Sequence, residues 1–315
     1  MKINFYELII IYFNDFINNI NYIYDSLFKY LKAMTEAEAV VYNEPKNLTT
    51  DNVLKIPSGI IPAKKRSYSR IYGKHDVLDG EYKLHQKLLA ELLGTMLFVY
   101  GVCSSNVFYG TYPSCAILGS CFMGGVIIYI FGRVSGAHFN PAVSLGLFLR
   151  HKLSCLELIL YVVMQIIGGF IGCVLVALCR RGKFKVMAGN SYTDYLIYVD
   201  GETKKKHGWN YVSALLFEIF GTFVLIMFIL ASCERDNYLG PTLGLAFSGT
   251  LIALSGIGGN ISGCSLNPAR SIAPAFIQLM AGGNKDPIKQ IWIYIVGPLV
   301  GAAIAAFVWP FFVYA

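Results

Sequence analysis

Charged residues are scarce in this chain of 315 residues: Asp, Glu, Lys and Arg make up 14% of it, against about 25% in soluble globular domains. Hydrophobic residues make up 55%, and the mean hydropathy is +0.53. This composition excludes an ordinary soluble protein and predicts one embedded in a bilayer. Seven Lys or Arg lie in residues 64–87 and seven in 180–209, outside the apolar runs. Such clusters are typical of membrane flanks, so we expect no nucleic-acid partner.

The sequence also lacks CxxC pairs, and it has no arrangement of a nucleophile with a base. Its eight cysteines stand mostly in or beside apolar runs. Metal centres and redox sites usually need closer spacing, so we interpret most of these cysteines as small core residues. The sequence therefore predicts no metal site, no cofactor and no enzymatic activity.

Six apolar runs have about the length of 20 residues that a membrane-spanning helix needs. They predict spans at 88–108, 115–132, 156–179, 211–233, 239–259 and 290–314. Residues 1–83 ahead of them are expected to form a flexible, cytosolic tail. Within the tail, residues 1–33 have apolar side chains at helical spacing, which indicates either a helix lying on the membrane surface or an extension ahead of a start at Met34.

One nine-residue stretch occurs twice and organises the chain. Residues 135–143 read Ser-Gly-Ala-His-Phe-Asn-Pro-Ala-Val, and residues 262–270 read Ser-Gly-Cys-Ser-Leu-Asn-Pro-Ala-Arg. Asn before Pro favours a helix start, because Asn can cap while Pro at the first position loses no hydrogen bond. We expect helices over Asn140–Leu149 and Asn267–Met280, each about half as long as a bilayer core is thick.

The stretch belongs to an internal repeat with an offset of 127 residues. Glu91 precedes Asn140 by 49 residues, and Glu218 precedes Asn267 by 49 residues. Agreement over several positions indicates a true repeat. Residues 1–83 would be followed by a first repeat at about 84–179, a loop at 180–209 and a second repeat at about 210–315.

The third spans of the two repeats are expected to pair as well. Residues 165–172 are aligned with residues 294–301, which shifts the offset by two residues. Because each repeat has three spans, an odd number, the second repeat enters the membrane from the opposite side. The repeats are therefore inverted, and the two half-helices meet N-terminus to N-terminus near the midplane.

Several polar residues are expected to serve this meeting point. Two helix N-termini would disfavour cations there, and the amides of Asn140 and Asn267 could donate hydrogen bonds to passing water. The matched spacing indicates that Glu91 and Glu218 accept backbone N–H groups of the two loops, helped by Gln165, although a proton relay is an alternative.

These motifs together resemble the aquaporins of the major intrinsic protein family. The resemblance covers about residues 84–315, and its most specific part is the pair of boxes formed by Asn140, Pro141, Ala142, Asn267, Pro268 and Ala269. It implies an all-α membrane protein with six tilted transmembrane helices and two re-entrant half-helices. It also implies one pore in each subunit and a homotetramer in the lipid bilayer.

The resemblance also assigns a selectivity filter to Ser120, Ser255, Cys264 and Arg270. Water-selective relatives carry an aromatic residue at the first position and His at the second, so this filter is expected to be wider; Phe122 could supply a ring if the register is shifted. The positions that distinguish water channels from glycerol channels give a mixed result. The residues at three of them, Ser271, Ala275 and Tyr294, resemble those of water channels, and Ile295 resembles the residue of glycerol channels.

The resemblance therefore implies a passive water channel, with small neutral solutes such as glycerol, urea or ammonia, that excludes protons and ions. Three alternatives remain: an aquaglyceroporin-like solute channel, a secondary transporter, and a non-conducting member that acts in adhesion or signalling. We expect the plasma membrane, with a cytosolic N-terminus.

Overall fold

The computed structural model describes residues 82–108, 113–180, 182–192, 195–199, 202–206, 210–232 and 242–313. The predicted helix within residues 1–33 and nearly all of the predicted tail lie outside these residues.

Five helices in the described part of the chain are long and apolar enough to cross a membrane. They are α2 (Leu84–Phe108), α3 (Pro113–Ser135), α5 (Cys155–Cys179), α6 (Asn210–Ser232) and α10 (Ile291–Val308). A sixth apolar helix, α7 (Leu243–Gly258), takes the place of the span predicted at 239–259. Its 16 residues reach about 24 Å, which is less than the bilayer core of about 30 Å. The all-helical membrane architecture is confirmed.

Both predicted half-helices are present, as α4 (Pro141–Leu149) and α8 (Pro268–Met280). Each begins as the Asn-Pro pair predicts. Asn140 and Asn267 have extended backbones, and each side-chain oxygen accepts a hydrogen bond from the backbone N–H two residues later, at 2.8 and 3.0 Å. Pro at the first helical position has no N–H to leave unsatisfied.

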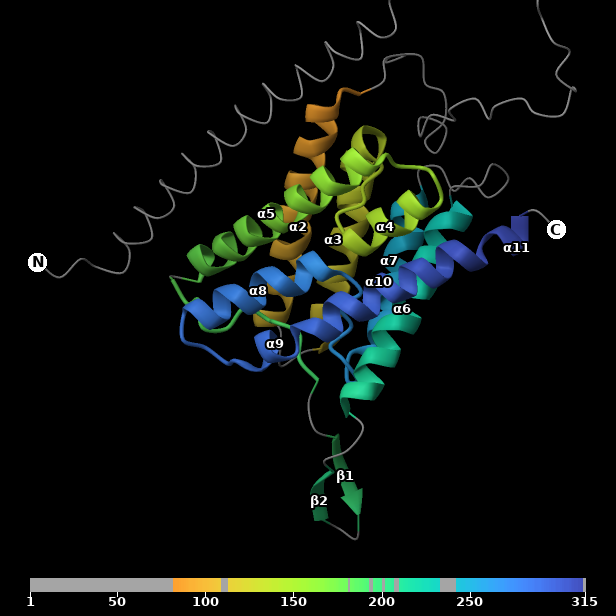
Figure 1. Ribbon diagram of the computed structural model, residues 1–315. Coiled ribbons are helices and arrows are strands. Elements are labelled where there is room, and N and C mark those ends of the chain that lie inside the picture. The colour runs from red at the N-terminus through yellow and green to blue at the C-terminus, as the bar shows by residue number, and fades with distance from the viewer. Residues whose placement is uncertain are drawn as a thin grey trace, which may run out of the picture. The chain divides into compact units, whose positions relative to one another are not determined.

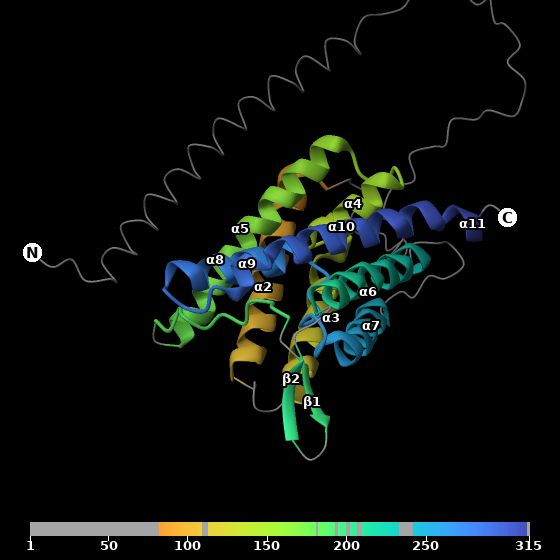
Figure 2. The same cartoon turned by 60° about the horizontal axis from the view of Figure 1, so that its bottom comes forward.

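The helices pair as an inverted repeat would (Figures 1 and 2). Helix α2 packs on α5, and its counterpart α6 packs on α10, while α3 packs on α7. Each half-helix lies against the third long helix of the other repeat, α4 on α10 and α8 on α5. Apolar side chains of α4, α6 and α10 form one buried cluster of Ala142, Val143, Leu147, Ile226, Leu230, Ala302 and Ala305. The half-helices thus bind the two repeats together.

The predicted alignment of the third spans is wrong by one helical turn. A Cβ on Gly168 of α5 would collide with the carbonyl of Leu92 in α2, and a Cβ on Gly301 of α10 would collide with the carbonyl of Ile219 in α6. Leu92 and Ile219 are 127 residues apart, so Gly301 corresponds to Gly168 and not to Gly172. Small residues recur every four positions in both helices, which allowed the sequence alignment to slip by four.

The loop predicted at 180–209 contains structure that the sequence analysis did not expect. Strands β1 (Tyr195–Val199) and β2 (Glu202–Lys206) pair antiparallel, with Tyr195 opposite Lys206. Figures 1 and 2 show this hairpin projecting away from the helices. Two short helices complete the fold, α9 (Asp286–Lys289) and α11 (Pro310–Val313). The last apolar span covers Ile291–Val313, close to the predicted 290–314, and its helix is interrupted at Trp309, since Pro310 has no N–H for the helical ladder.

Candidate pore constriction

The two box loops, residues 136–140 and 263–267, meet through reciprocal hydrogen bonds. Asn140 Nδ2 donates to the carbonyl of Leu266 over 2.8 Å, and Asn267 Nδ2 donates to the carbonyl of Phe139 over 2.9 Å. Each asparagine therefore caps its own half-helix with its oxygen and holds the opposite loop with its nitrogen. The N-termini of α4 and α8, two centres of partial positive charge, face each other at this point.

Both loops share one backbone conformation. Phe139 and Leu266, just before the asparagines, have φ values of 49° and 55°, and Ala137 and Cys264 have φ values of 53° and 46°. The left-handed region is costly for residues with a Cβ and persists where the surroundings enforce it. Two identical sets of such residues indicate that both loops are held in a defined, strained shape.

Two buried carboxyl groups hold the loops in that shape. The carboxyl oxygens of Glu91 lie within hydrogen-bonding distance of four donors: Ser135 Oγ at 2.6 Å, the N–H groups of His138 and Phe139 at 3.0 and 2.8 Å, and Gln165 Nε2 at 2.8 Å. Both Glu91 and Glu218 have no exposed surface. Since buried backbone N–H groups need partners, the first carboxyl satisfies donors that the left-handed turns leave outside any helix.

The second loop repeats the arrangement with one donor fewer. Glu218 accepts hydrogen bonds from Ser262 Oγ at 2.6 Å and from the N–H groups of Ser265 and Leu266 at 2.9 and 2.8 Å. Gln165 has no amide counterpart, because Pro298 stands at the corresponding position of α10 when Gly301 is matched to Gly168. The 49-residue spacing in the sequence thus brings each Glu to the loop of its own repeat.

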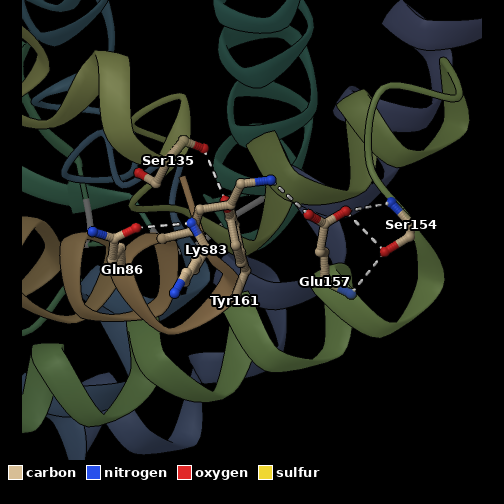
Figure 3. A network of polar contacts seen from close by, with 7 residues as sticks. Lys83, Gln86, Ser135, Ser154, Glu157 and Tyr161 are labelled. Atoms are coloured by element: carbon tan, nitrogen blue, oxygen red, sulfur yellow. Dashed lines mark hydrogen bonds and ion pairs between the residues drawn. The ribbon is translucent and has the colours of Figure 1, made fainter. Parts of the chain in front are cut away.

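Each box loop is bound to a long helix by one tyrosine. Only one of the two tyrosines, Tyr294, was singled out from the sequence. Tyr161 of α5 donates from its hydroxyl to the carbonyl of Ser135 over 2.9 Å, and Tyr294 of α10 donates to the carbonyl of Ser262 over 2.7 Å. Figure 3 shows the first of these contacts beside the capping box that starts α5. Their equivalence was hidden because the sequence alignment was displaced by a turn.

A small cavity lies where the loops meet. The volume open to the centres of water molecules is about 30 Å³, which is room for about two waters. Asn140, Asn267 and the loop residues before them form part of its lining. Apolar residues line the rest, including Phe98, Ile127, Leu225 and Leu251. Each asparagine amide has a second N–H, so the cavity offers donors to a water oxygen within an otherwise apolar wall.

Three of the four predicted filter residues lie close together, linked by a cysteine that the sequence analysis did not single out. Cys121 Sγ lies 3.7 Å from Ser255 Oγ and 4.0 Å from Ser120 Oγ, and Ser255 Oγ lies 3.8 Å from Cys264 Sγ. Ser120 also donates to carbonyls of its own helix. Phe122, the alternative ring, is 44% exposed. These positions carry small side chains, without an aromatic or imidazole ring.

The fourth predicted filter residue, Arg270, is held by the segment that follows α5. Its Nη1 donates to the carbonyl of Ala188 over 3.2 Å and to Asn190 Oδ1. Arg270 is 6% exposed. No signal in the sequence pointed to Asn190, because it lies between the repeats and has no counterpart at the 127-residue offset.

Two of the predicted solute-class markers, Ser271 and Tyr294, contact the second box loop. Ser271 contacts Ser265 Oγ and donates to Asn190 Oδ1 over 3.0 Å. Ala275 is buried in α8, and Ile295 is half-buried in α10. Across the described ranges, no three His, Cys, Asp or Glu side chains gather in a way that could hold a metal ion.

Comparison with known proteins identifies the family. A profile of the family described as Major intrinsic protein matches residues 80–309. Nodulin-26 of Glycine max is 32% identical over 231 residues, 71% of this chain and 76% of that protein. Probable aquaporin NIP4-2 of Arabidopsis thaliana is 34% identical over 236 residues, 72% of this chain and 75% of that protein.

A solved structure supports the same fold. The X-ray structure of the aquaglyceroporin from Plasmodium falciparum aligns with a TM-score of 0.62 and 22% identity, covering 72% of this chain and 96% of that one. The long apolar helices, the paired half-helices and these matches lead to one conclusion: the chain is an integral membrane protein and belongs to the major intrinsic protein family, a family of channels and not of enzymes.

Proposed function

We propose that this protein is a passive channel that conducts water, together with small neutral solutes such as glycerol, urea or ammonia, and excludes protons and ions. The observation that carries the proposal is the reciprocal bonding of Asn140 and Asn267 to the opposite loops. It sets two helix N-termini and two amide donors around a cavity with room for about two water molecules.

The constriction favours neutral molecules for an electrostatic reason. Each half-helix N-terminus carries a partial charge of about +0.5, and both face the cavity, so a cation there is repelled. A water molecule that accepts hydrogen bonds from Asn140 and Asn267 points its own hydrogens away from them. It can then pass between donors without forming the continuous hydrogen-bonded chain that carries protons. Glu91, Glu218 and Gln165 serve this geometry by supporting the loops.

The residues of the proposed filter favour the passage of small neutral solutes in addition to water. Ser120, Ser255 and Cys264 have short side chains, and Arg270 supplies a cation that attracts hydroxyl and carbonyl oxygens and repels other cations. This supports an aquaglyceroporin-like channel as the second candidate. The names of relatives agree with both, since one is a probable aquaporin and the solved structure is of an aquaglyceroporin.

Assembly and location follow from the same proposal. We propose a homotetramer with one pore in each subunit, in the plasma membrane, with the N-terminus on the cytosolic side. The seven basic residues of 64–87 are matched by seven in 180–209 on the opposite side, and Arg150 and Lys152, which share the side of the tail, favour this orientation.

Stopped-flow light scattering on proteoliposomes tests the proposal. The purified protein is reconstituted beside a matched Asn267→Asp variant, and both are exposed to sorbitol, glycerol and urea gradients. In the sorbitol gradient, we expect vesicles with the wild-type protein to shrink faster than empty vesicles. In the glycerol or urea gradient, we expect them to reswell after shrinking. Wild-type traces equal to those of empty vesicles would instead favour a non-conducting member of the family. Flux that depends on an ion gradient would indicate a secondary transporter.

A further inference from the structure

The segment between the two repeats is bound at several points to the second repeat. The Met187 N–H donates to Gln278 Oε1 over 3.3 Å, and the Tyr192 N–H donates to Gln290 Oε1 over 2.8 Å. Between them, Gly189 lies so close to Pro287 that a Cβ would come within 2.9 Å of it. Residues 187–192 are therefore fixed against the end of α8 and the start of α10.

Asn190, in the middle of this segment, is a buried hydrogen-bonding centre with 4% of its surface exposed. Its Oδ1 accepts from Arg270 Nη1 and from Ser271 Oγ, and its Nδ2 donates to the carbonyl of Gly263 over 3.0 Å. An amide oxygen has two lone pairs, so both are in use. One side chain thus joins the filter arginine, the second half-helix and the second box loop.

Comparison of the two repeats supports a dedicated role for this amide. In the first repeat, Ser144 Oγ accepts a hydrogen bond from the amide of Gln165 over 3.0 Å. Its counterpart in the second repeat, Ser271, cannot find such a partner on α10, where Pro298 stands. Asn190 contacts Ser271 from outside the repeat instead, but its Oδ1 accepts a hydrogen bond from the serine, whereas Gln165 donates one, and Asn190 also binds a charged group.

The hydrogen bonds of Arg270 show which of its guanidinium donors are engaged by the protein. The Nη1 nitrogen donates two hydrogen bonds, one to the Ala188 carbonyl and one to Asn190 Oδ1. A guanidinium has three further N–H donors, on Nε and Nη2. Among the described residues, neither of these two nitrogens is a buried atom that lacks a hydrogen-bond partner. With Nη1 anchored, these donors are the ones left to meet a solute.

We propose that Asn190 is a positioning residue for the filter: it fixes the Arg270 side chain, with Ser271, so that the remaining guanidinium donors keep one orientation toward passing solutes. The proposal rests on the proposed channel function. It predicts that solute selectivity depends on Asn190 through Arg270, and not through the stability of the fold.

A double-mutant cycle tests this dependence. Glycerol and water permeabilities are measured on the same proteoliposomes for wild type, Asn190→Ala, Arg270→Ala and the double variant. Their ratio cancels any loss of correctly folded protein. We expect Asn190→Ala to raise the ratio by about three-fold or more, since a hydrogen bond to a charged group contributes strongly to holding it. In the Arg270→Ala background the same substitution is expected to leave the ratio unchanged, because the partner is gone.

Three further variants complete the test. Asn190→Asp keeps an oxygen acceptor for Arg270 and Ser271, so we expect it to restore the wild-type ratio. As a control, Asn284→Ala removes an exposed asparagine whose side-chain oxygen accepts from the Asp286 N–H, and it should not change the ratio of glycerol to water permeability. If Asn190→Ala cannot be reconstituted, Asn190→Ser takes its place. A wild type that conducts, with Asn190→Ala at the wild-type ratio or an equal shift in both backgrounds, would overturn the inference alone. A wild type that conducts nothing would overturn the proposed function.

Discussion

Substitution of Glu91 by Gln tests whether a buried carboxyl group holds the first box loop. Each carboxyl oxygen of Glu91 accepts two hydrogen bonds, Oε1 from Ser135 and His138, and Oε2 from Phe139 and Gln165. Glutamine keeps one acceptor oxygen and places an NH₂ group against two donors. A buried donor left without a partner costs about 1–3 kcal/mol, so the substitution should lower the free energy of unfolding by about 2–6 kcal/mol.

Thermal unfolding of the purified protein in detergent measures this loss. For a domain of this size, about 2–4 °C is lost per kcal/mol, so we expect the midpoint of Glu91→Gln to fall by about 4 °C or more. The matched control is Glu157→Gln, since glutamine also serves in the capping box with Ser154. Its ion pair with Lys87 is only partly buried, and such a pair near the surface is worth about 0–1 kcal/mol. Equal midpoints for both variants would refute the structural role of Glu91.

Three further substitutions test the constriction and its packing. Asn267→Asp removes the donor to the Phe139 carbonyl and weakens the contact between the two box loops by about 1–3 kcal/mol, so water permeability should fall below that of the wild type, and an unchanged rate would contradict this. Gly94→Ala, whose Cβ would overlap the Phe139 ring, should lower the unfolding temperature by overpacking worth about 1–3 kcal/mol, whereas Gly256→Ala, with open space around it, should not. Cys264→Ser should abolish inhibition of water flux by mercurials; retained inhibition would reject a pore-lining Cys264.

The features that sequence predicts best here are local and repeated. Asn followed by Pro specifies a capped helix start by its own chemistry, so α4 and α8 begin at Pro141 and Pro268 as expected. The equal spacing of Glu91 and Glu218 from the boxes carried information about contacts between distant segments, because a repeated fold repeats its contacts. Those contacts could be anticipated without any coordinates.

What the sequence could not supply lies outside the repeat or depends on helix register. Asn190 sits in the connecting segment, where no second copy exists for comparison, and its partners are 73 to 81 residues away. Cys121 reaches Ser255 only because α3 packs on α7. The equivalence of Tyr161 and Tyr294 was missed because a regular spacing of small residues allows helices to be aligned a turn apart.

The central claim is that two opposed half-helices pass water and stop protons. It is tested most directly by recording osmotic shrinkage and internal pH together, in proteoliposomes that contain a pH-sensitive dye, under combined osmotic and proton gradients. The account predicts shrinkage faster than in empty vesicles and a pH trace that matches theirs. Shrinkage no faster than in empty vesicles, or an internal pH that collapses with the gradient, would contradict it.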